Sequence, residues 1–129
     1  MMRRRLILIA EDEPDTARLL EFHLRRHGYT TAVAPDGLTA VNTVFEKKPV
    51  LIILDLMLPL MHGFEVCRLV KSSPTGNQIP IIMLTAMAST ENKLEGFKQG
   101  ADDYVTKPFV MSELIARVEA LLQRAQTEA

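Results

Sequence analysis

The segment Leu6-Ile-Leu-Ile-Ala-Glu-Asp12 sets five apolar residues directly before two acids, and Val50-Leu-Ile-Ile-Leu-Asp55 sets five before one acid. Runs that are apolar throughout are typical of strands buried on both faces of a parallel sheet. Carboxylates at the ends of two buried strands are costly unless positive charge lies between them. The two segments therefore predict a parallel sheet with an acidic site at one edge.

Outward from these segments, short apolar runs alternate with segments of helical periodicity. The runs expected to be strands are Leu6–Ala10, Thr30–Ala34, Val50–Leu54, Ile81–Leu84 and Tyr104–Thr106. Helices are expected from Pro14 to a left-handed Gly28, after Pro35-Asp36-Gly37, after Gly63, from Thr90 to Gln99, and from Ser112 onward. The second helix is expected to bury Ala40, Val41, Val44 and Phe45. Strands and helices in this alternation imply helices on both faces of the sheet and right-handed crossovers.

The expected fold is a single doubly wound α/β domain, with a five-stranded parallel sheet in the order 2-1-3-4-5 and five helices. In that order the connections of strands 1 and 3 leave in opposite directions, which opens a crevice at their carboxyl ends. Glu11, Asp12 and Asp55 follow these two strands, while Thr85 and Lys107 follow strands 4 and 5. We expect residues 1–124 to form the domain and residues 125–129, which lose apolar periodicity, to form a tail or the start of a linker.

Composition and charge argue against several classes of protein. The chain has 129 residues, enough for one domain with a real core, and its net charge of -1 favours neither nucleic acid nor an anionic membrane. One cysteine, Cys67, excludes an internal disulfide and fits a reducing compartment. No segment approaches the roughly 18 apolar residues of a membrane span. We therefore expect a cytoplasmic protein that does not bind nucleic acid directly through this segment.

The acids and the lysine suit a site that accepts a phosphoryl group on an aspartate. Mg²⁺ prefers oxygen ligands, commonly one or two carboxylates together with water and phosphate. Asp12 and Asp55 can bind it directly, Glu11 can act through water, and a backbone carbonyl just past Asp55 can complete the set. Lys107 and the Thr85 hydroxyl can bind other phosphoryl oxygens.

Other functions share parts of this pattern. A flavin or nucleotide carrier needs a Gly- or Ser/Thr-rich loop after strand 1 to cradle phosphate, whereas Glu11-Asp12-Glu13 would repel it. A Mg²⁺-dependent phosphatase would carry a second acid two positions after its nucleophile, but Pro14 stands two positions after Asp12. A purely structural module would not need the acidic cluster. Within the cluster, we interpret Glu13 as an acidic cap for the helix that begins at Pro14.

Four segments resemble the receiver domain of two-component response regulators, and together they span nearly the whole chain. They are Leu6-Ile-Leu-Ile-Ala-Glu-Asp-Glu-Pro14, Asp55-Leu-Met-Leu-Pro59 with Gly63, Leu84-Thr-Ala86, and Gly100-Ala-Asp-Asp-Tyr-Val-Thr-Lys-Pro-Phe109. The resemblance implies a flavodoxin-like fold and a signalling protein, not an enzyme that turns over a separate substrate. Its implied partner is a sensor histidine kinase or a phosphotransfer protein.

The resemblance also implies roles for single residues. Asp55 is the implied phosphoacceptor and Lys107 the residue that pairs with the phosphate. Glu11 and Asp12 are the implied acidic pair, and Mg²⁺ is implied to bind Asp12, Asp55 and the backbone carbonyl of Met57.

Switching is implied to involve Thr85 and Tyr104. The threonine hydroxyl is expected to move to the phosphoryl group while the aromatic ring turns inward, and Pro108 is expected to follow a cis peptide bond. The face formed by helix 4, strand 5 and helix 5 would then change and control a partner or an effector domain.

In the subgroup with winged-helix DNA-binding effectors, that face forms a symmetric dimer through charged pairs. We therefore expect a homodimer on phosphorylation, with transcription as a candidate output. The residues at similar positions here are Lys93, Asp102, Asp103, Glu113 and Arg117. Met57 and Met87 stand where other members carry polar groups that position water, so we expect slow hydrolysis of the phosphorylated form.

Overall fold

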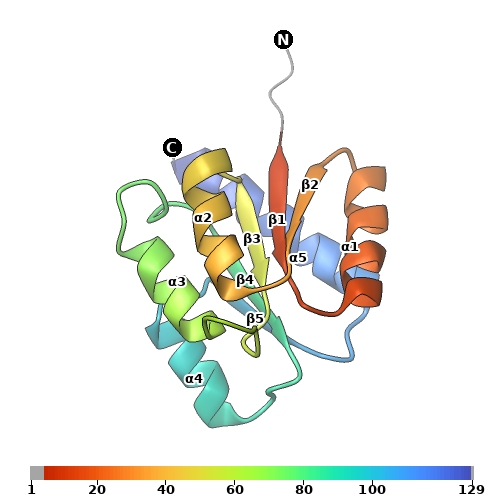
Figure 1. Ribbon diagram of the computed structural model, residues 1–129. Coiled ribbons are helices and arrows are strands. Elements are labelled where there is room, and N and C mark those ends of the chain that lie inside the picture. Colours follow the sequence, from red (N-terminus) through yellow and green to blue (C-terminus); the bar gives the residue numbers. More distant parts are fainter. Residues whose placement is uncertain (1–4, 129) are drawn as a thin grey trace.

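The computed structural model describes the backbone of residues 5–128 and the side chains of residues 5–125. Strands and helices alternate along this part of the chain (Figure 1). The strands are β1 (Leu6–Ala10), β2 (Thr30–Ala34), β3 (Leu51–Leu54), β4 (Ile81–Thr85) and β5 (Asp103–Thr106). The helices are α1 (Pro14–Arg26), α2 (Gly37–Lys47), α3 (Gly63–Lys71), α4 (Thr90–Lys98) and α5 (Met111–Glu128). The strands begin and end within one residue of the predicted runs.

The sheet is parallel, and its strand order is β2-β1-β3-β4-β5, which confirms the doubly wound prediction. Its register aligns the strand ends that carry the acids. Ala10 of β1 pairs with Leu54 of β3, and the Asp55 N–H donates to the Ala10 carbonyl at 3.0 Å. At the other side, the Lys107 N–H donates to the Thr85 carbonyl at 2.8 Å. Backbone pairing therefore brings these positions to one edge of the sheet.

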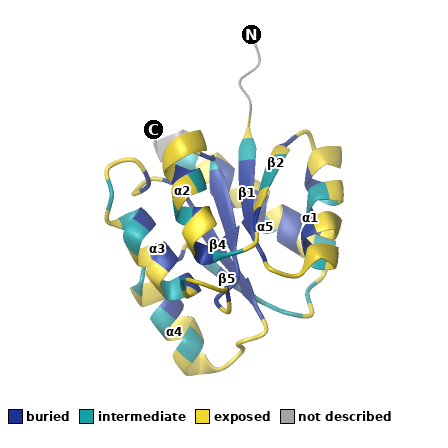
Figure 2. Cartoon of the chain, viewed as in Figure 1, coloured by how far each residue is buried: buried dark blue, intermediate teal, exposed yellow. Residues whose placement is uncertain are grey.

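Two apolar cores lie on opposite faces of the sheet, and the outer faces of the helices are exposed (Figure 2). Alternate β3 residues contribute side chains to the two cores, because successive side chains of a strand point to opposite faces of the sheet. Ile52 and Leu54 join the core beneath α2 and α3, while Leu51 and Ile53 join the core beneath α1 and α5. Strand β3 is apolar throughout because both faces of the sheet are covered at this strand.

Helix α2 departs from the predicted burial. Ala40 and Val44 are buried, Val41 is only partly buried, and Phe45 is 40% exposed. The buried stripe runs through Gly37, Ala40 and Val44, at spacings of three and four residues. Phe45 lies about 100° around the helix from Val44 and therefore falls outside this stripe.

The predicted helix ends are otherwise close to the observed ones. Gly28 has a φ of 91° after α1, in the left-handed region that favours glycine. Helix α5 continues to Glu128, past the domain boundary expected after residue 124, and that boundary stays a prediction. No helix among the described residues combines the length and apolar character that a membrane crossing requires.

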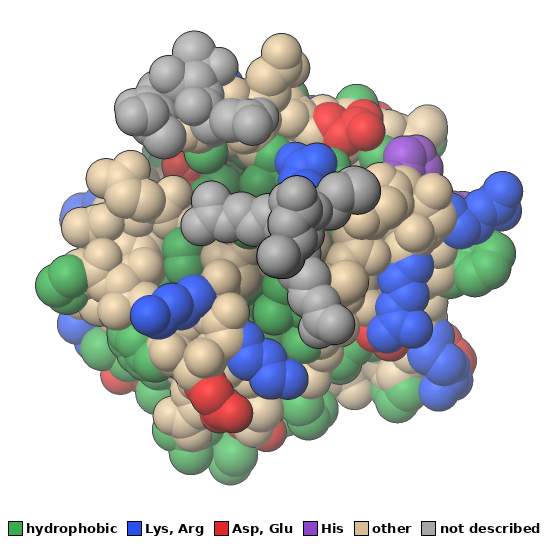
Figure 3. Space-filling view, turned by 90° about the horizontal axis from the view of Figure 1, so that it is seen from above, with side chains coloured by type: hydrophobic (Ala, Val, Ile, Leu, Met, Phe, Trp, Pro, Cys, Tyr) green, Lys and Arg blue, Asp and Glu red, His purple; other side chains and the backbone are tan. Residues whose placement is uncertain are grey.

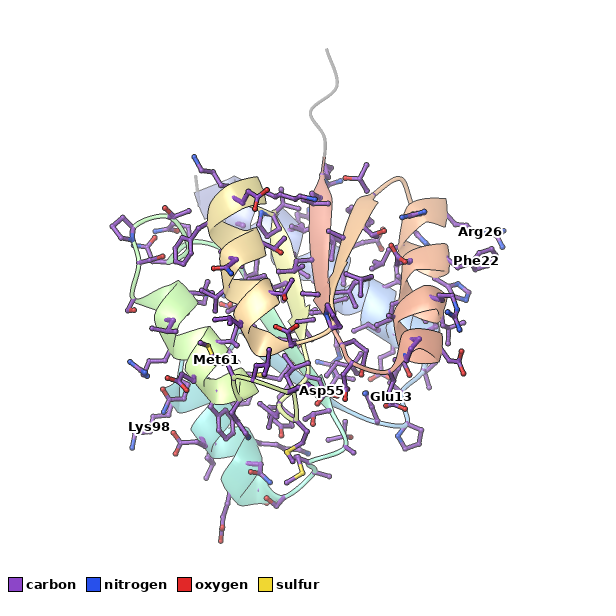
Figure 4. All side chains as sticks on the ribbon, in the orientation of Figure 1. Glu13, Phe22, Arg26, Asp55, Met61 and Lys98 are labelled. Atoms are coloured by element: carbon purple, nitrogen blue, oxygen red, sulfur yellow. The ribbon has the colours of Figure 1, made fainter. Side chains whose placement is uncertain are left out.

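The two ends of the sheet differ in charge. Helices start where the strands end and finish where the strands begin, and basic residues in their last turns compensate the partial negative charge there. Figure 3 looks onto the end where the strands begin and shows several Lys and Arg side chains on it. The predicted acidic site lies at the opposite end, beside Asp55 and Glu13 in Figure 4.

Candidate functional site

Three carboxylates from two neighbouring strands meet where β1 and β3 end. Single carboxylate oxygens of Glu11, Asp12 and Asp55 all lie within 4.8 Å of one another. Glu11 and Asp55 are buried, at 3% and 6% exposure, whereas Asp12 is exposed. The structure therefore brings together the three acids that the sequence predicts.

Lys107 supplies positive charge to this cluster from the loop after β5. Its Nζ donates to Glu11 Oε1 at 2.7 Å and to Asp55 Oδ2 at 3.0 Å. Burial by itself lowers the pKa of Lys107, but the hydrogen bonds to Glu11 and Asp55 outweigh that effect and raise the pKa above its ordinary value. Lys107 is thus a fixed cation at neutral pH.

Burial has the opposite consequence for Glu11. It raises the pKa of the Glu11 carboxyl, and the hydrogen bonds from Lys107 and from the Glu13 N–H offset this increase only in part. The Asp55 charge adds to the increase. One ammonium group therefore does not fully compensate the buried acids, which leaves the cluster suited to a further cation.

Glu13 lies at the start of α1, as interpreted from the sequence, and its side chain also reaches the cluster. It occupies the N-cap position of α1, but its side chain makes no capping hydrogen bond within the described residues. Its Oε1 lies instead 3.4 Å from Lys107 Nζ. Glutamate is not among the residues favoured for side-chain capping, but an acid at this position still faces the partial positive charge of the helix N-terminus. The long side chain is free to reach a cation across the site.

Thr85 ends β4 and is fully buried. Its hydroxyl oxygen accepts a hydrogen bond from the Met87 N–H at 3.3 Å. The backbone carbonyl of the same residue accepts the Lys107 N–H. Thr85 therefore connects the loop after β4 with the segment that carries the lysine.

Tyr104 lies on β5 with its ring in the core beneath α2 and α3. Its hydroxyl donates to the Met87 carbonyl. Burial, followed by the negative charge of Asp55, raises the pKa of the Tyr104 hydroxyl. The side chain is therefore buried in this structure. The Lys107–Pro108 peptide bond next to the site is cis, as the resemblance implied.

A model of the response regulator receiver domain matches residues 7–119 of the chain. The chain belongs to the response regulator receiver family. Its sequence is 46% identical to the DNA-binding response regulator MtrA of Mycolicibacterium smegmatis over 127 residues, which are 98% of this chain and 54% of that protein. The receiver therefore spans about half the length of this curated relative.

Solved receiver structures agree with the fold. The receiver domain of the Francisella response regulator 1452 is 36% identical, with a TM-score of 0.87 over 94% of this chain and 98% of that chain. The BeF3-activated N-terminal receiver domain of Klebsiella pneumoniae RstA is 32% identical, with a TM-score of 0.84 over 91% and 97% of the two chains. These likenesses extend over nearly the whole receiver.

The acidic cluster of this receiver suits Mg²⁺. Carboxylate oxygens are ligands that Mg²⁺ prefers, and the three acids converge closely enough to share one ion. The Met57 N–H donates to Asp55 Oδ1 at 3.2 Å, so the loop that carries the implied third ligand is tied to the Asp55 side chain. The donor set therefore fits the ion that the receiver family implies.

The five charged residues expected on the dimer face do not form a single group. Arg117 Nη1 lies 2.8 Å from Asp103 Oδ2, and Arg117 Nη2 lies 3.4 Å from Glu113 Oε1. Lys93 is exposed on α4. Asp102 instead accepts from Lys71 Nζ of α3 at 3.0 Å and from the Ile81 N–H at 2.8 Å. Asp102 is therefore engaged between α3 and β4.

Proposed function

We propose that this receiver is a phosphorylation-activated switch that takes a phosphoryl group onto Asp55 from a sensor histidine kinase or a phosphotransfer protein. The observation that carries the proposal is the contact of Lys107 Nζ with Asp55 Oδ2 inside a cluster of further acids. A buried carboxylate with a fixed cation on one oxygen is suited to receive a group that brings more negative charge.

In the proposed transfer, a carboxylate oxygen of Asp55 attacks the phosphorus of a phosphohistidine. The phosphorus–nitrogen bond breaks, its electron pair stays on the imidazole, and an acyl phosphate forms. Asp12, Asp55 and the Met57 carbonyl would hold Mg²⁺, with Glu11 acting through water, and the ion would supply positive charge next to the phosphoryl oxygens. Lys107 exchanges its bond to the carboxylate for one to a phosphoryl oxygen.

Thr85 and Tyr104 form the proposed switch pair. The Thr85 hydroxyl accepts from the Met87 N–H, and the Tyr104 hydroxyl donates to the Met87 carbonyl. A phosphoryl oxygen offers Thr85 a stronger acceptor for its own proton. Movement of Thr85 toward it would displace the Met87 backbone and so act on Tyr104 and α4. The phosphoryl group thereby shifts the population of two loop arrangements.

The output is proposed to be homodimer formation through α4, β5 and α5, followed by control of an effector domain. Asp103, Glu113 and Arg117 supply charges of both signs on this face. The curated relative is a DNA-binding regulator of about twice this length, which supports transcription as the output of a longer protein. In this proposal the receiver itself ends near residue 124 and touches no nucleic acid.

Acetyl phosphate with Mg²⁺ tests the phosphoryl transfer. We expect intact-mass spectrometry to find one added phosphate on the parent and none on Asp55→Asn. Asp36→Asn is the matched control, because Asp36 caps α2 and asparagine caps equally well. This control should be labelled like the parent. Equal labelling of Asp55→Asn, or no labelling of the parent, would contradict the proposal.

A further inference from the structure

The loop between β3 and α3 contains a tight turn shortly after Asp55. The Met61 N–H donates to the Pro59 carbonyl at 2.8 Å, which closes a γ-turn around Leu60. Leu60 has a φ of 70°, in the left-handed region that residues with a side chain seldom adopt. Its side chain is 78% exposed, so burial of that side chain does not explain the conformation. A strained turn of this kind persists only where the surrounding structure holds it.

The first residue of α2 holds this turn from outside the loop. The Gly37 N–H donates to the Pro59 carbonyl at 3.0 Å, so the oxygen that closes the γ-turn also accepts from α2. The first N–H groups of a helix have no acceptor within the helix and need one elsewhere. The start of α2 and the turn therefore satisfy each other's backbone groups.

Gly37 also leaves the space that the turn occupies. A Cβ atom built on Gly37 would lie 2.1 Å from the Met61 carbonyl oxygen and 2.7 Å from Met61 Cβ. These separations are far below ordinary contacts of about 3.5–4.0 Å, and the nearest atom is backbone, which cannot rotate away. Met61, labelled in Figure 4, packs partly buried against the core beneath α2 and α3. A side chain at position 37 would therefore displace the backbone of the turn.

The turn belongs to the segment that carries the implied metal ligand. The Met57 N–H donates to Asp55 Oδ1 at 3.2 Å. At the base of the loop, the Gly63 N–H donates to the Leu56 carbonyl at 2.8 Å. Gly63 thus closes the loop beside β3, while Gly37 holds its far end. The backbone of Met57 lies between these two points in the chain, so both constrain the direction of its carbonyl.

We propose that Gly37 is a positioning residue for the Mg²⁺ site, because it holds the Pro59–Met61 turn and so sets how the loop presents the Met57 carbonyl. This role rests on the proposed function, in which that carbonyl is a ligand. Gly37 acts through the turn, not through contact with the acids. Residues that orient a metal ligand typically affect metal affinity by about 10- to 100-fold.

NMR titration with MgCl₂ at constant ionic strength tests this role. We expect Gly37→Ala to bind Mg²⁺ at least about 10-fold more weakly than the parent. Val44→Ala is the control, because Val44 is buried on the same stripe of α2 and its truncation destabilises the helix away from the turn. The control should bind within about 2-fold of the parent, since distant sites act independently. Unchanged affinity of Gly37→Ala, or an equal loss in Val44→Ala, would overturn the inference.

Leu60→Pro changes the same turn from the loop side and leaves α2 intact. Proline holds φ near about −65°, which is incompatible with the φ of 70° at this position. Because the Leu60 side chain is mostly exposed, its loss removes little packing. We expect Mg²⁺ affinity to fall at least about 10-fold here as well. Unchanged affinity would show that the turn does not position the Met57 carbonyl, and would overturn the inference even if Gly37→Ala does not fold.

Hydrogen exchange of the parent tests the contact without a substitution. The N–H of a first helical residue has no acceptor within the helix, so protection of the Gly37 N–H reports its bond to the Pro59 carbonyl. We expect this N–H to exchange at least about 10-fold more slowly than an unprotected peptide N–H. Exchange at the unprotected rate would overturn the inference.

The parent protein distinguishes failure of this inference from failure of the proposed function. If the parent binds no Mg²⁺, the proposed function fails and the role of Gly37 fails with it. If the parent binds Mg²⁺ and is labelled by acetyl phosphate, while Gly37→Ala binds the ion equally well, the proposed function stands and only the role of Gly37 is refuted.

Discussion

Lys107 Nζ lies 2.7 Å from Glu11 Oε1, although 96 positions separate the two residues in the chain. The contact forms because β1 and β5 are parallel strands of one sheet and both residues directly follow a strand end. Asp55 shares the same ammonium group at 3.0 Å and Glu13 lies 3.4 Å from it. Three carboxylates thus lie in contact with one ammonium group.

Lys107→Met should lower the free energy of unfolding at pH 7 by roughly 1–3 kcal/mol, because it leaves buried acceptors without their donor. Mg²⁺ should restore part of the loss, since it supplies positive charge to the same carboxylates. Urea unfolding with and without Mg²⁺ measures both effects. Lys98→Met, on exposed α4 surface, is the control and should stay within about 0.5 kcal/mol of the parent. Equal stability of the Lys107 variant and the parent would contradict the prediction.

Cys67 should make stability depend on pH in the alkaline range. Burial raises the pKa of its thiol from 9.0 to about 11. Because the folded-state pKa is the higher one, the stability that this group contributes is complete below pH 9.0 and is lost as the pH rises through about 11. The difference in free energy of unfolding between the parent and Cys67→Ala should therefore shrink by roughly 2 kcal/mol across this range. If the difference in free energy of unfolding between the parent and Cys67→Ala stays constant between these pH values, the pKa of the thiol is not raised in the folded protein.

The phosphorylated receiver should lose its phosphoryl group slowly. Met57 and Met87 follow Asp55 and Thr85 by two positions, are exposed, and offer no side-chain donor to position water. Met57→Asn introduces an amide that can do so and should shorten the lifetime of the label. The decay of radiolabel from purified phosphoprotein measures both rates. Loss from the parent within minutes, without a phosphatase, would refute slow hydrolysis.

Arg117 should be needed for the dimer that phosphorylation is expected to produce. Arg117→Glu places a third acid beside Asp103 and Glu113, so beryllofluoride should no longer convert monomer to dimer in sedimentation velocity. Asp102→Asn is the comparison. It should weaken the contact with Lys71 and lower the thermal midpoint, yet leave dimerisation intact, because Asp102 faces α3. Loss of the dimer in Asp102→Asn alone would reverse these assignments.

The parallel sheet and the convergence of Glu11, Asp12 and Asp55 were predictable from the sequence. Short apolar runs such as Leu51–Leu54 are typical of strands buried on both faces. Parallel strands end at one edge, so a residue that follows such a run has its position set by the backbone alone. Lys107 was predicted at the edge for the same reason.

Side-chain direction was decided by the tertiary structure. Glu13 turns to Lys107, Asp102 to Lys71, and the Tyr104 ring lies against Gly96. Glu13 and Lys107 are 94 positions apart and Asp102 and Lys71 are 31 apart, while Tyr104 and Gly96 belong to consecutive elements. In each case, sequence spacing allows several other partners for the side chain. The sequence by itself determined which residues reach the site, because hydrophobic periodicity sets backbone register. Only the packed fold decided what they touch, because that depends on neighbours that periodicity does not encode.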